Sequence, residues 1–249
     1  GPDTVAAFIA EPIMGAGGVI IPPATYFEKI QTVLRKYDVL MIADEVICGF
    51  GRTGRMWGSQ VFDIEPDILS CAKALSGAYL PISAVMVSEE IFDEMVKQSE
   101  KHGAFAHGFT YSGHPVPAAV GMRTMELMEE RNILGHVRHV SKRFVERFNA
   151  LADHPLVGEV RATGLIGAVE LVADKKTKRP FDPKFKAGTK AYEAMQKAGL
   201  ISRAVAGDNL ALCPPLIITE SEIDEMFDRF TKGLDDAAAM AFAENWRND

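Results

Sequence analysis

Short apolar runs alternate with a helical segment along the first half of the chain. The runs at Val5–Ala10, Val39–Ala43, Ile68–Cys71 and Ile82–Val87 predict strands, and each is largely apolar. Between the first two runs, Tyr26–Tyr37 places its apolar residues at helical spacing on one face. Strands of this kind are typical of a parallel sheet covered on both faces. We therefore predict an α/β fold with a mostly parallel sheet for this half.

The second half mixes helices and extended segments. A helical pattern runs from Pro115 to Leu151 with a break near Asn132–Gly135, and Val157–Val172 reads as two strands joined by a turn. The remaining pattern predicts helices over 184–198 and 221–246, with Ser221 as an N-cap, and strands over 200–205 and 210–213. We therefore expect part of a large domain over residues 1–125 and a smaller α+β domain over residues 126–249, with the boundary inside the long helix.

The composition excludes several functional classes. The net charge is −7 and no basic stripe is present, which argues against a nucleic-acid binder. No apolar run reaches the roughly 18 residues that a membrane helix needs. Cys48, Cys71 and Cys213 are too few and too widely spaced for a disulfide framework or a zinc site. We therefore expect a reducing, cytoplasmic location and no metal.

The start of the chain is abrupt for a natural domain. Residue 1 is Gly rather than Met, and a fully apolar run begins within five residues. We therefore expect this chain to be the C-terminal part of a longer protein.

Lys73 differs from the other lysines, most of which lie among charged residues. It follows a predicted strand and has the apolar neighbours Cys71, Ala72, Ala74 and Leu75. A lysine desolvated in this way has a lowered pKa and a nucleophilic amine, as a Schiff-base lysine requires. The alternative is a lysine that reaches from the strand end into water.

Asp44 and Glu45 follow another predicted strand, and open α/β folds bind ligands at the carboxyl ends of their strands. A carboxylate there can pair with the ring nitrogen of pyridoxal phosphate and keep it protonated. If the strand continued, Val46 would share the face of Asp44 and could pack on the ring. A structural acid that caps a helix is the alternative.

Two loops carry weaker signals. GFGRTG at Gly49–Gly54 matches the dinucleotide-binding pattern, but the next residues do not predict the helix that this pattern needs. HGFTYSGHP at 107–115 offers the hydroxyls of Thr110 and Ser112 for a phosphate and the ring of Phe109 for a pocket wall. An NAD-dependent oxidoreductase that uses GFGRTG therefore remains an alternative function.

The order of these motifs resembles that of the class III (ω-) aminotransferases, which are fold-type-I pyridoxal-phosphate enzymes. The matching motifs are, in order, IAEPIMGAGG, the strand-end Asp-Glu, GFGRTG, PDI, AKALSG, HGFTYSGHP and GDNLALCPPLIIT. The resemblance covers essentially the whole chain. It implies that Lys73 is the Schiff-base lysine and proton shuttle, that Asp44 pairs with the pyridine nitrogen and that Val46 packs on the ring. It also implies that Thr110 binds the cofactor phosphate of a neighbouring subunit in a dimer or higher homo-oligomer with shared active sites.

The resemblance also bears on the substrates. Glutamate-using members carry an acid where this chain has Ala16, and many carry an arginine where it has Ala211. Arg203 resembles the mobile arginine of the ω-amino acid:pyruvate subgroup; the alternative is a surface arginine near Asp208. We therefore expect an aminotransferase that moves an amino group from an ω-amino acid or a primary amine to pyruvate, with Phe109 also near the substrate. Other pyridoxal-phosphate reactions, such as decarboxylation or an aminomutase shift, and a non-catalytic fragment remain alternatives.

Overall fold

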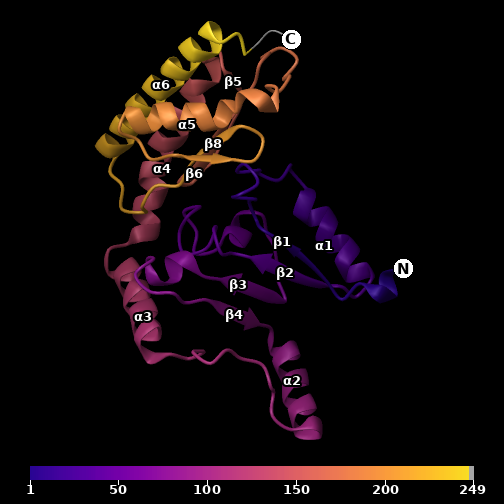
Figure 1. Ribbon diagram of the computed structural model, residues 1–249. Coiled ribbons are helices and arrows are strands. Elements are labelled where there is room, and N and C mark those ends of the chain that lie inside the picture. Colours follow the sequence, from indigo (N-terminus) through magenta and orange to yellow (C-terminus); the bar gives the residue numbers. More distant parts are fainter. Residues whose placement is uncertain (247–249) are drawn as a thin grey trace. The chain divides into compact units, whose positions relative to one another are not determined.

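The computed structural model describes residues 1–246, which form two compact units (Figure 1). The N-terminal unit comprises residues 1–12, 22–51 and 55–132, and the C-terminal unit comprises residues 13–21, 52–54 and those from 133 onwards. The units change between Asn132 and Ile133, in a turn between two helices, whereas we expected a boundary near residue 125 inside a helix. That the two units are domains of a longer protein stays a prediction. Within residues 1–246, every helix is too short or too polar to cross a lipid bilayer.

A four-stranded mixed sheet forms the centre of the N-terminal unit. Its strands lie in the order β1 (Ala7–Ala10), β2 (Leu40–Asp44), β3 (Ile68–Cys71) and β4 (Ala84–Val87). β1, β2 and β3 are parallel, with Ala43 beside both Ala10 and Leu69, and β4 is antiparallel to β3. The four predicted strands and the mostly parallel sheet are therefore confirmed.

Three helices accompany this sheet. They are α1 (Tyr26–Lys36), α2 (Glu89–His102) and α3 (Pro115–Glu130), and short 3₁₀ turns lie at Pro2–Thr4, Gly58–Val61 and Lys73–Ser76. α2 is not among the predicted elements, although its sequence carries a helix-start signal. The Ser88 hydroxyl accepts a hydrogen bond from the Ile91 amide at 3.4 Å, and Glu89 and Glu90 follow in the first turn.

The sheet of the N-terminal unit is only partly covered. Phe27 and Leu34 of α1 pack with Met41 of β2 and with Ile64, and all four side chains are buried. In contrast, all of β4 is exposed, with Val85 at 67%. Our expectation of a sheet covered on both faces is therefore not met within residues 1–246.

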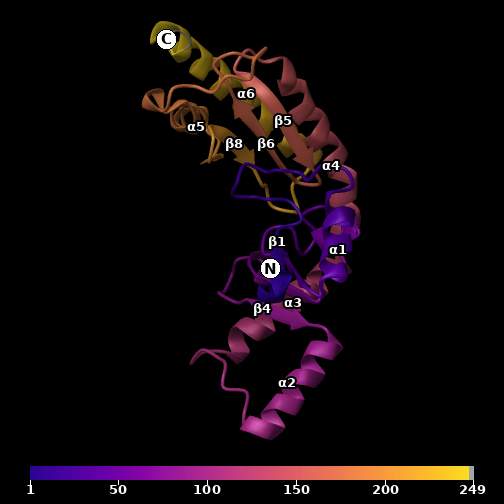
Figure 2. The same ribbon diagram turned by 90° about the vertical axis from the view of Figure 1, so that its right-hand side faces the viewer.

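The C-terminal unit combines an antiparallel sheet with three helices (Figure 2). The strands lie in the order β5 (Val157–Thr163), β6 (Ile166–Leu171), β8 (Asn209–Leu212) and β7 (Arg203–Val205). The helices are α4 (Ile133–Ala150), α5 (Ala187–Lys197) and α6 (Glu220–Ala243), and 3₁₀ turns lie at Leu151–Asp153 and Pro183–Phe185. This arrangement confirms the predicted α+β half, including the break between α3 and α4.

The two faces of this second sheet differ in chemistry. A Cβ on Gly167 would lie 2.5 Å from the ring of Phe148 in α4, so this face packs directly against the helices. The core on that side contains four buried aromatic rings from α4 and α6, which are Phe144, Phe148, Phe227 and Phe230. Because side chains alternate along a strand, Ala168 and its cross-strand neighbours Arg161 and Ala211 point to the opposite face.

The start of α6 corrects one sequence prediction. Thr219, not Ser221, is the N-cap, and its hydroxyl accepts a hydrogen bond from the Glu222 amide at 3.3 Å. The Glu222 carboxylate in turn accepts from the Thr219 amide at 2.8 Å. This reciprocal pair satisfies two amide donors at the helix start, whereas a start at Ser221 would leave Glu222 without that role.

Candidate active site

Asp44 and Lys73 lie at the same edge of the N-terminal sheet. Asp44 is the last residue of β2 and is paired with Ser70 of β3. Lys73 follows two residues after the end of β3. Because β2 and β3 are parallel neighbours, their carboxyl ends meet at one edge, where open α/β sheets bind ligands. The structure thus places the two residues that we singled out from the sequence at the same edge of the sheet.

The backbone of Lys73 has an unusual conformation. Its φ is +43°, in the left-handed region that side chains other than glycine rarely adopt. It is the first residue of the short 3₁₀ turn Lys73–Ser76, which Gly77 caps. Such a residue costs on the order of 1–3 kcal/mol and is found preferentially at functional sites. Other residues away from this edge, such as Thr25 and Lys178, also have a positive φ, so the conformation of Lys73 does not by itself mark a site.

The side chain of Lys73 corrects the argument by which we selected it. We expected apolar neighbours to desolvate the amine, but Lys73 is exposed in this structure. Leu75 and Cys71 are buried, so the apolar residues around Lys73 point into the unit while the lysine points out. A positively charged end needs water or a partner, and exposure gives the amine of Lys73 access to water.

Glu45 is a buried carboxylate at this edge whose role the sequence did not reveal. It is 0% exposed and accepts three hydrogen bonds. Its Oε2 accepts from the Gly58 amide at 2.8 Å, and its Oε1 accepts from the amide and the hydroxyl of Ser59, each at 2.6 Å. A Cβ on Gly58 would lie 2.5 Å from Cys48, so only glycine allows this approach. Glu45 therefore fixes the segment after the GFGRTG loop beside the end of β2.

Cys71 ends β3 beside this carboxylate and is 3% exposed. Burial raises the pKa of its thiol, and the negative charge of Glu45 raises it further. Because the thiolate is the reactive form, Cys71 is expected to be unreactive near neutral pH.

The end of β2 also changes the reasoning about Val46. The strand stops at Asp44, and the Val46 amide donates to Asp44 Oδ1 at 3.0 Å. This turn means that strand alternation does not place Val46 on the face of Asp44, contrary to the condition we stated. A contact between Val46 and a cofactor ring stays a prediction.

The GFGRTG loop does not lead into the helix that dinucleotide binding requires. Residues 51–57 form turns and bends, and the short 3₁₀ turn Gly58–Val61 follows. Arg52 and Gly54 belong to the C-terminal unit and form hydrogen bonds with other residues of that unit. Arg52 Nη1 donates to the carbonyl of Leu165 at 3.0 Å, and Arg138 Nη1 donates to the carbonyl of Gly54 at 3.0 Å. These contacts favour a structural role for the loop and weaken the NAD alternative.

Phe109 and Thr110 lie in the loop between α2 and α3, which is exposed. The Phe109 ring is 81% exposed. The Phe109 amide donates to the Ser112 hydroxyl at 3.0 Å, and the Ser112 amide donates to the Phe109 carbonyl at 2.9 Å, so these bonds stay within the loop. The proposed contacts of Thr110 with a phosphate and of Phe109 with a substrate stay predictions.

Arg203 is the first residue of β7 and is paired directly with Ala211 of β8. Directly paired residues share a face of the sheet, so Arg203 and Ala211 lie side by side on one face. Its side chain is exposed, and its guanidinium has no hydrogen-bond or ion-pair partner within residues 1–246. Asp208, which we considered as its surface partner, instead accepts a hydrogen bond from the Gly188 amide at 2.8 Å.

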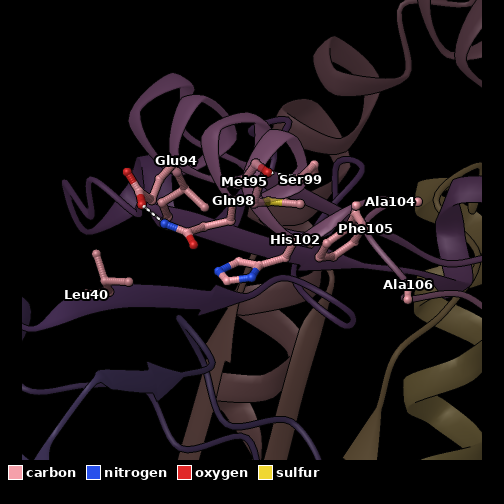
Figure 3. A pocket seen from close by; sticks show the side chains of 11 residues that line it. Leu40, Glu94, Met95, Gln98, Ser99, His102, Ala104, Phe105 and Ala106 are labelled. Carbon is pink, nitrogen blue, oxygen red and sulfur yellow. Dashed lines mark hydrogen bonds between the residues drawn. The ribbon is translucent and has the colours of Figure 1, made fainter.

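A cavity of about 550 Å³ lies beside α2 (Figure 3). It is lined mainly by α2 and by the loop that follows, including His102 and Phe105, and by Leu40. Leu40 is the first residue of β2, so it marks the end of the strand opposite to Asp44. The Gln98 amide donates to the Glu94 carboxylate at 2.6 Å, which satisfies two of the polar groups at its wall. This cavity is therefore not part of the edge that holds Asp44 and Lys73.

Comparison with known proteins gives a consistent family. The aminotransferase class-III family model matches residues 1–234. A γ-aminobutyrate transaminase of Solanum lycopersicum is 52% identical over 236 residues, which are 95% of this chain and 45% of that protein. A vanillin aminotransferase of Capsicum chinense is 49% identical over 236 residues, which are 95% of this chain and 51% of that protein.

Solved structures agree with this result. A transaminase solved with L-alanine superimposes with a TM-score of 0.93 at 51% identity, over 96% of this chain and 56% of that chain. The chain thus spans about half the length of the relatives it matches.

The expected cytoplasmic location is contradicted by the relatives. The protein of Solanum lycopersicum is named as chloroplastic, and a γ-aminobutyrate transaminase of Oryza sativa subsp. indica, 54% identical over 226 residues, is named as mitochondrial. Cysteine count could not distinguish these compartments, because it reports only on disulfide use.

Proposed function

The chain belongs to the class-III aminotransferase family, and we propose that the protein containing it transfers an amino group from an ω-amino acid or a primary amine to pyruvate. Enzymes of this family depend on pyridoxal phosphate. Donor and acceptor would react in turn in a ping-pong cycle. The observation that carries this proposal is the joint position of Asp44 and Lys73 at the carboxyl edge of the parallel strands.

The residues at this edge fit the cofactor. A pyridine nitrogen needs an anionic partner to hold its proton, and the Asp44 carboxylate is half-buried at the strand end, where it can supply one. An aldehyde carbon needs an amine, and Lys73 extends outward from a constrained turn. When bound, pyridoxal phosphate supplies an electron sink that stabilises negative charge on the substrate carbon.

Each residue then has a defined task. Asp44 holds a proton on the ring nitrogen and orients the ring. Lys73 Nζ would hold the cofactor covalently. When free, its amine would accept the proton from the substrate carbon and later return one, as a general base and acid. The exposed side chain of Lys73 is accessible for both tasks.

Arg203 is proposed to meet the substrate carboxylate. One relative is named for γ-aminobutyrate, which has a carboxylate, and another for vanillin, which has none. A cation on an edge strand without a fixed partner can approach a carboxylate and withdraw for an uncharged substrate. The arginine fork is also suited to bidentate carboxylate binding.

Pyruvate is proposed as the acceptor because it has one carboxylate, and Arg203 is the one residue proposed to bind a substrate carboxylate. Ala16 and Ala211 replace the acid and the arginine of the glutamate-using relatives. A second carboxylate, as in 2-oxoglutarate, would lack a partner there, which costs several kcal/mol if it stays charged. A solved transaminase with L-alanine, the amine counterpart of pyruvate, supports the same acceptor class.

Shared active sites in a homo-oligomer complete the proposal. Thr110 and Phe109 lie in an exposed loop, as residues that serve a second subunit would. Thr110 is proposed to bind the cofactor phosphate of the neighbouring subunit. Phe109 is proposed to lie against the substrate, and Val46 is proposed to pack on the cofactor ring.

A spectroscopic cycle tests the proposal on the full-length protein. Addition of an amine donor should bleach the visible absorption of the bound cofactor, and pyruvate should restore it. 2-Oxoglutarate should restore it much more slowly at equal concentration. Equal rates for the two acids would contradict the acceptor assignment, and a bleached form that neither acid restores would favour one of the other pyridoxal-phosphate reactions.

A further inference from the structure

The face of the C-terminal sheet that points away from the helices carries a row of four paired residues. Arg161 of β5 pairs with Ala168 of β6, Ala168 pairs with Ala211 of β8, and Ala211 pairs with Arg203 of β7. All four side chains therefore lie on one face, with an arginine at each end. The two arginines differ completely in their surroundings.

Arg161 is almost buried and has all of its donors engaged. Its side chain is 9% exposed. Nε and Nη2 donate to the carbonyl of Gly18 at 3.1 and 2.9 Å, and Nη1 donates to Glu159 at 3.0 Å and to Glu170 at 2.9 Å. Nη2 also donates to the Asn209 side-chain oxygen. A guanidinium has five N–H donors, so none remains for a ligand.

The Gly18 carbonyl belongs to the loop that contains Ala16. This loop is closed by a bridge between Met14 and Ile20 and has Gly18 at φ +118°. A Cβ on Gly18 would lie 2.9 Å from the Asn209 amide nitrogen. Glycine is therefore needed both for the backbone conformation and for the close approach to the sheet.

Asn209 extends this network to the hairpin of Arg203. Its amide nitrogen donates to the carbonyls of Ala206 and Gly207, which form the turn between β7 and β8. One connected set of hydrogen bonds thus joins the Gly18 loop, Arg161 and the β7–β8 turn. The loop and the hairpin are held in one arrangement on the same face of the sheet.

We propose that Arg161 is a positioning residue for substrate selection. It fixes the loop around Ala16 relative to the hairpin that carries Arg203, and so sets the space in which Arg203 meets a carboxylate. Arg161 itself does not touch the substrate, because its donors are all used. This inference rests on the proposed role of Arg203 in carboxylate binding.

Four variants of the full-length holoenzyme test the inference in the donor half-reaction. They are Arg161→Lys, Gly18→Ala, Arg203→Ala and the double variant Arg161→Lys/Arg203→Ala. The donors are 4-aminobutyrate, which has a carboxylate, and 1-phenylethylamine, which has none. Arg147→Lys is the matched control, because Arg147 also bonds two acids, Asp224 and Asp228, but lies in α4.

Arg161→Lys should lower kcat/KM for 4-aminobutyrate by about tenfold, a coupling typical of residues in one network, and leave 1-phenylethylamine within about twofold. Lysine cannot reach Gly18, the two acids and Asn209 at once. The change should be much smaller in the Arg203→Ala background. Gly18→Ala should also lower kcat/KM for 4-aminobutyrate more than for 1-phenylethylamine, without removing the ion pairs. Amide hydrogen exchange of residues 13–21 should accelerate in Arg161→Lys and in Gly18→Ala.

The outcomes separate this inference from the proposed function. Equal losses with both donors in Arg203→Ala would refute the role of Arg203. A second outcome is that Arg203→Ala lowers activity only with 4-aminobutyrate, as proposed, while Arg161→Lys affects both donors equally or the effects add in the double variant. That result would refute the positioning role of Arg161 and leave the role of Arg203 intact. If Arg161→Lys does not fold, Gly18→Ala decides: discrimination between the donors supports positioning, and none overturns it. A selective loss of activity with 4-aminobutyrate in Arg147→Lys would show that any arginine–acid pair has this effect, and would also overturn the positioning role of Arg161.

Discussion

Replacing Glu45 by Gln tests how the edge that carries Asp44 is held in place. The two carboxylate oxygens of Glu45 accept from the amides of Gly58 and Ser59 and from the Ser59 hydroxyl. Glutamine offers one oxygen and one NH₂ group. In either orientation of the amide, the NH₂ group faces a backbone N–H, so one buried amide loses its acceptor.

The magnitude follows from these contacts. A buried donor without an acceptor costs about 1–3 kcal/mol. The remaining hydrogen bonds also lose the charge that makes them roughly twice as strong as neutral ones. Removing a buried charge recovers part of this cost, because the carboxylate no longer has to be desolvated. We expect a net loss of about 1–3 kcal/mol in the free energy of unfolding, and weaker cofactor binding because Asp44 is the adjacent residue.

Urea unfolding of the cofactor-free full-length protein measures the first effect, and titration with pyridoxal phosphate measures the second. Glu65→Gln is the matched control, since Glu65 makes one ion pair with Arg35 and its side chain is 81% exposed. We expect no measurable change in that variant. If Glu45→Gln is as stable as Glu65→Gln and binds cofactor normally, Glu45 does not hold this edge.

Three further predictions concern single groups. Lys73→Ala should fold but form no covalent bond to the cofactor, and borohydride should link the cofactor to Lys73 in the parent protein; labelling of another lysine, detected by peptide mapping, would contradict the assignment. Asp44→Asn should bind cofactor and lose most transamination, because a neutral amide cannot hold the ring proton; near-normal turnover would show that Asp44 is not the ring partner. Hydrogen bonds from Lys178 and then Arg161 hold the pKa of Glu159 below its ordinary 4.5, so its stabilisation is present above pH 4.5 and is lost as the pH falls through the lowered pKa. Thermal unfolding of Glu159→Gln should therefore lose less stability over that range than the parent, and parallel pH profiles would count against this explanation.

Much of the fold follows from local patterns. The apolar runs identify all four strands of the first sheet, including β4, which is antiparallel to β3 and exposed within residues 1–246. The order Asp44, then Lys73, each after such a run, was enough to place both at one sheet edge. The parallel register that brings them together follows from the topology of β2 and β3.

Features that depend on distant residues could not be predicted in this way. The partners of Glu45 lie 13 and 14 residues away in a segment without periodic pattern. The sequence gives no signal for the positive φ of Lys73 or for the exposure of its side chain, both of which the structure shows. The burial of Arg161 depends on a glycine carbonyl at a sequence separation of 143 residues. In each case tertiary contacts, not local propensity, decide the outcome.

The separation between Gly18 and Arg161 has a consequence for synthesis on the ribosome. At roughly 5–20 residues per second, the loop at 13–21 leaves the ribosome on the order of ten seconds before its partner strand β5 exists. β1, β2 and β3 are all complete by residue 71, so their sheet can pair during this delay, while the loop waits without its binding surface. The hydrogen bonds between Gly18, Arg161 and Asn209 must therefore form late in folding. Translation speed and chaperone protection between residues 21 and 161 would then affect their assembly more than that of the edge that holds Lys73.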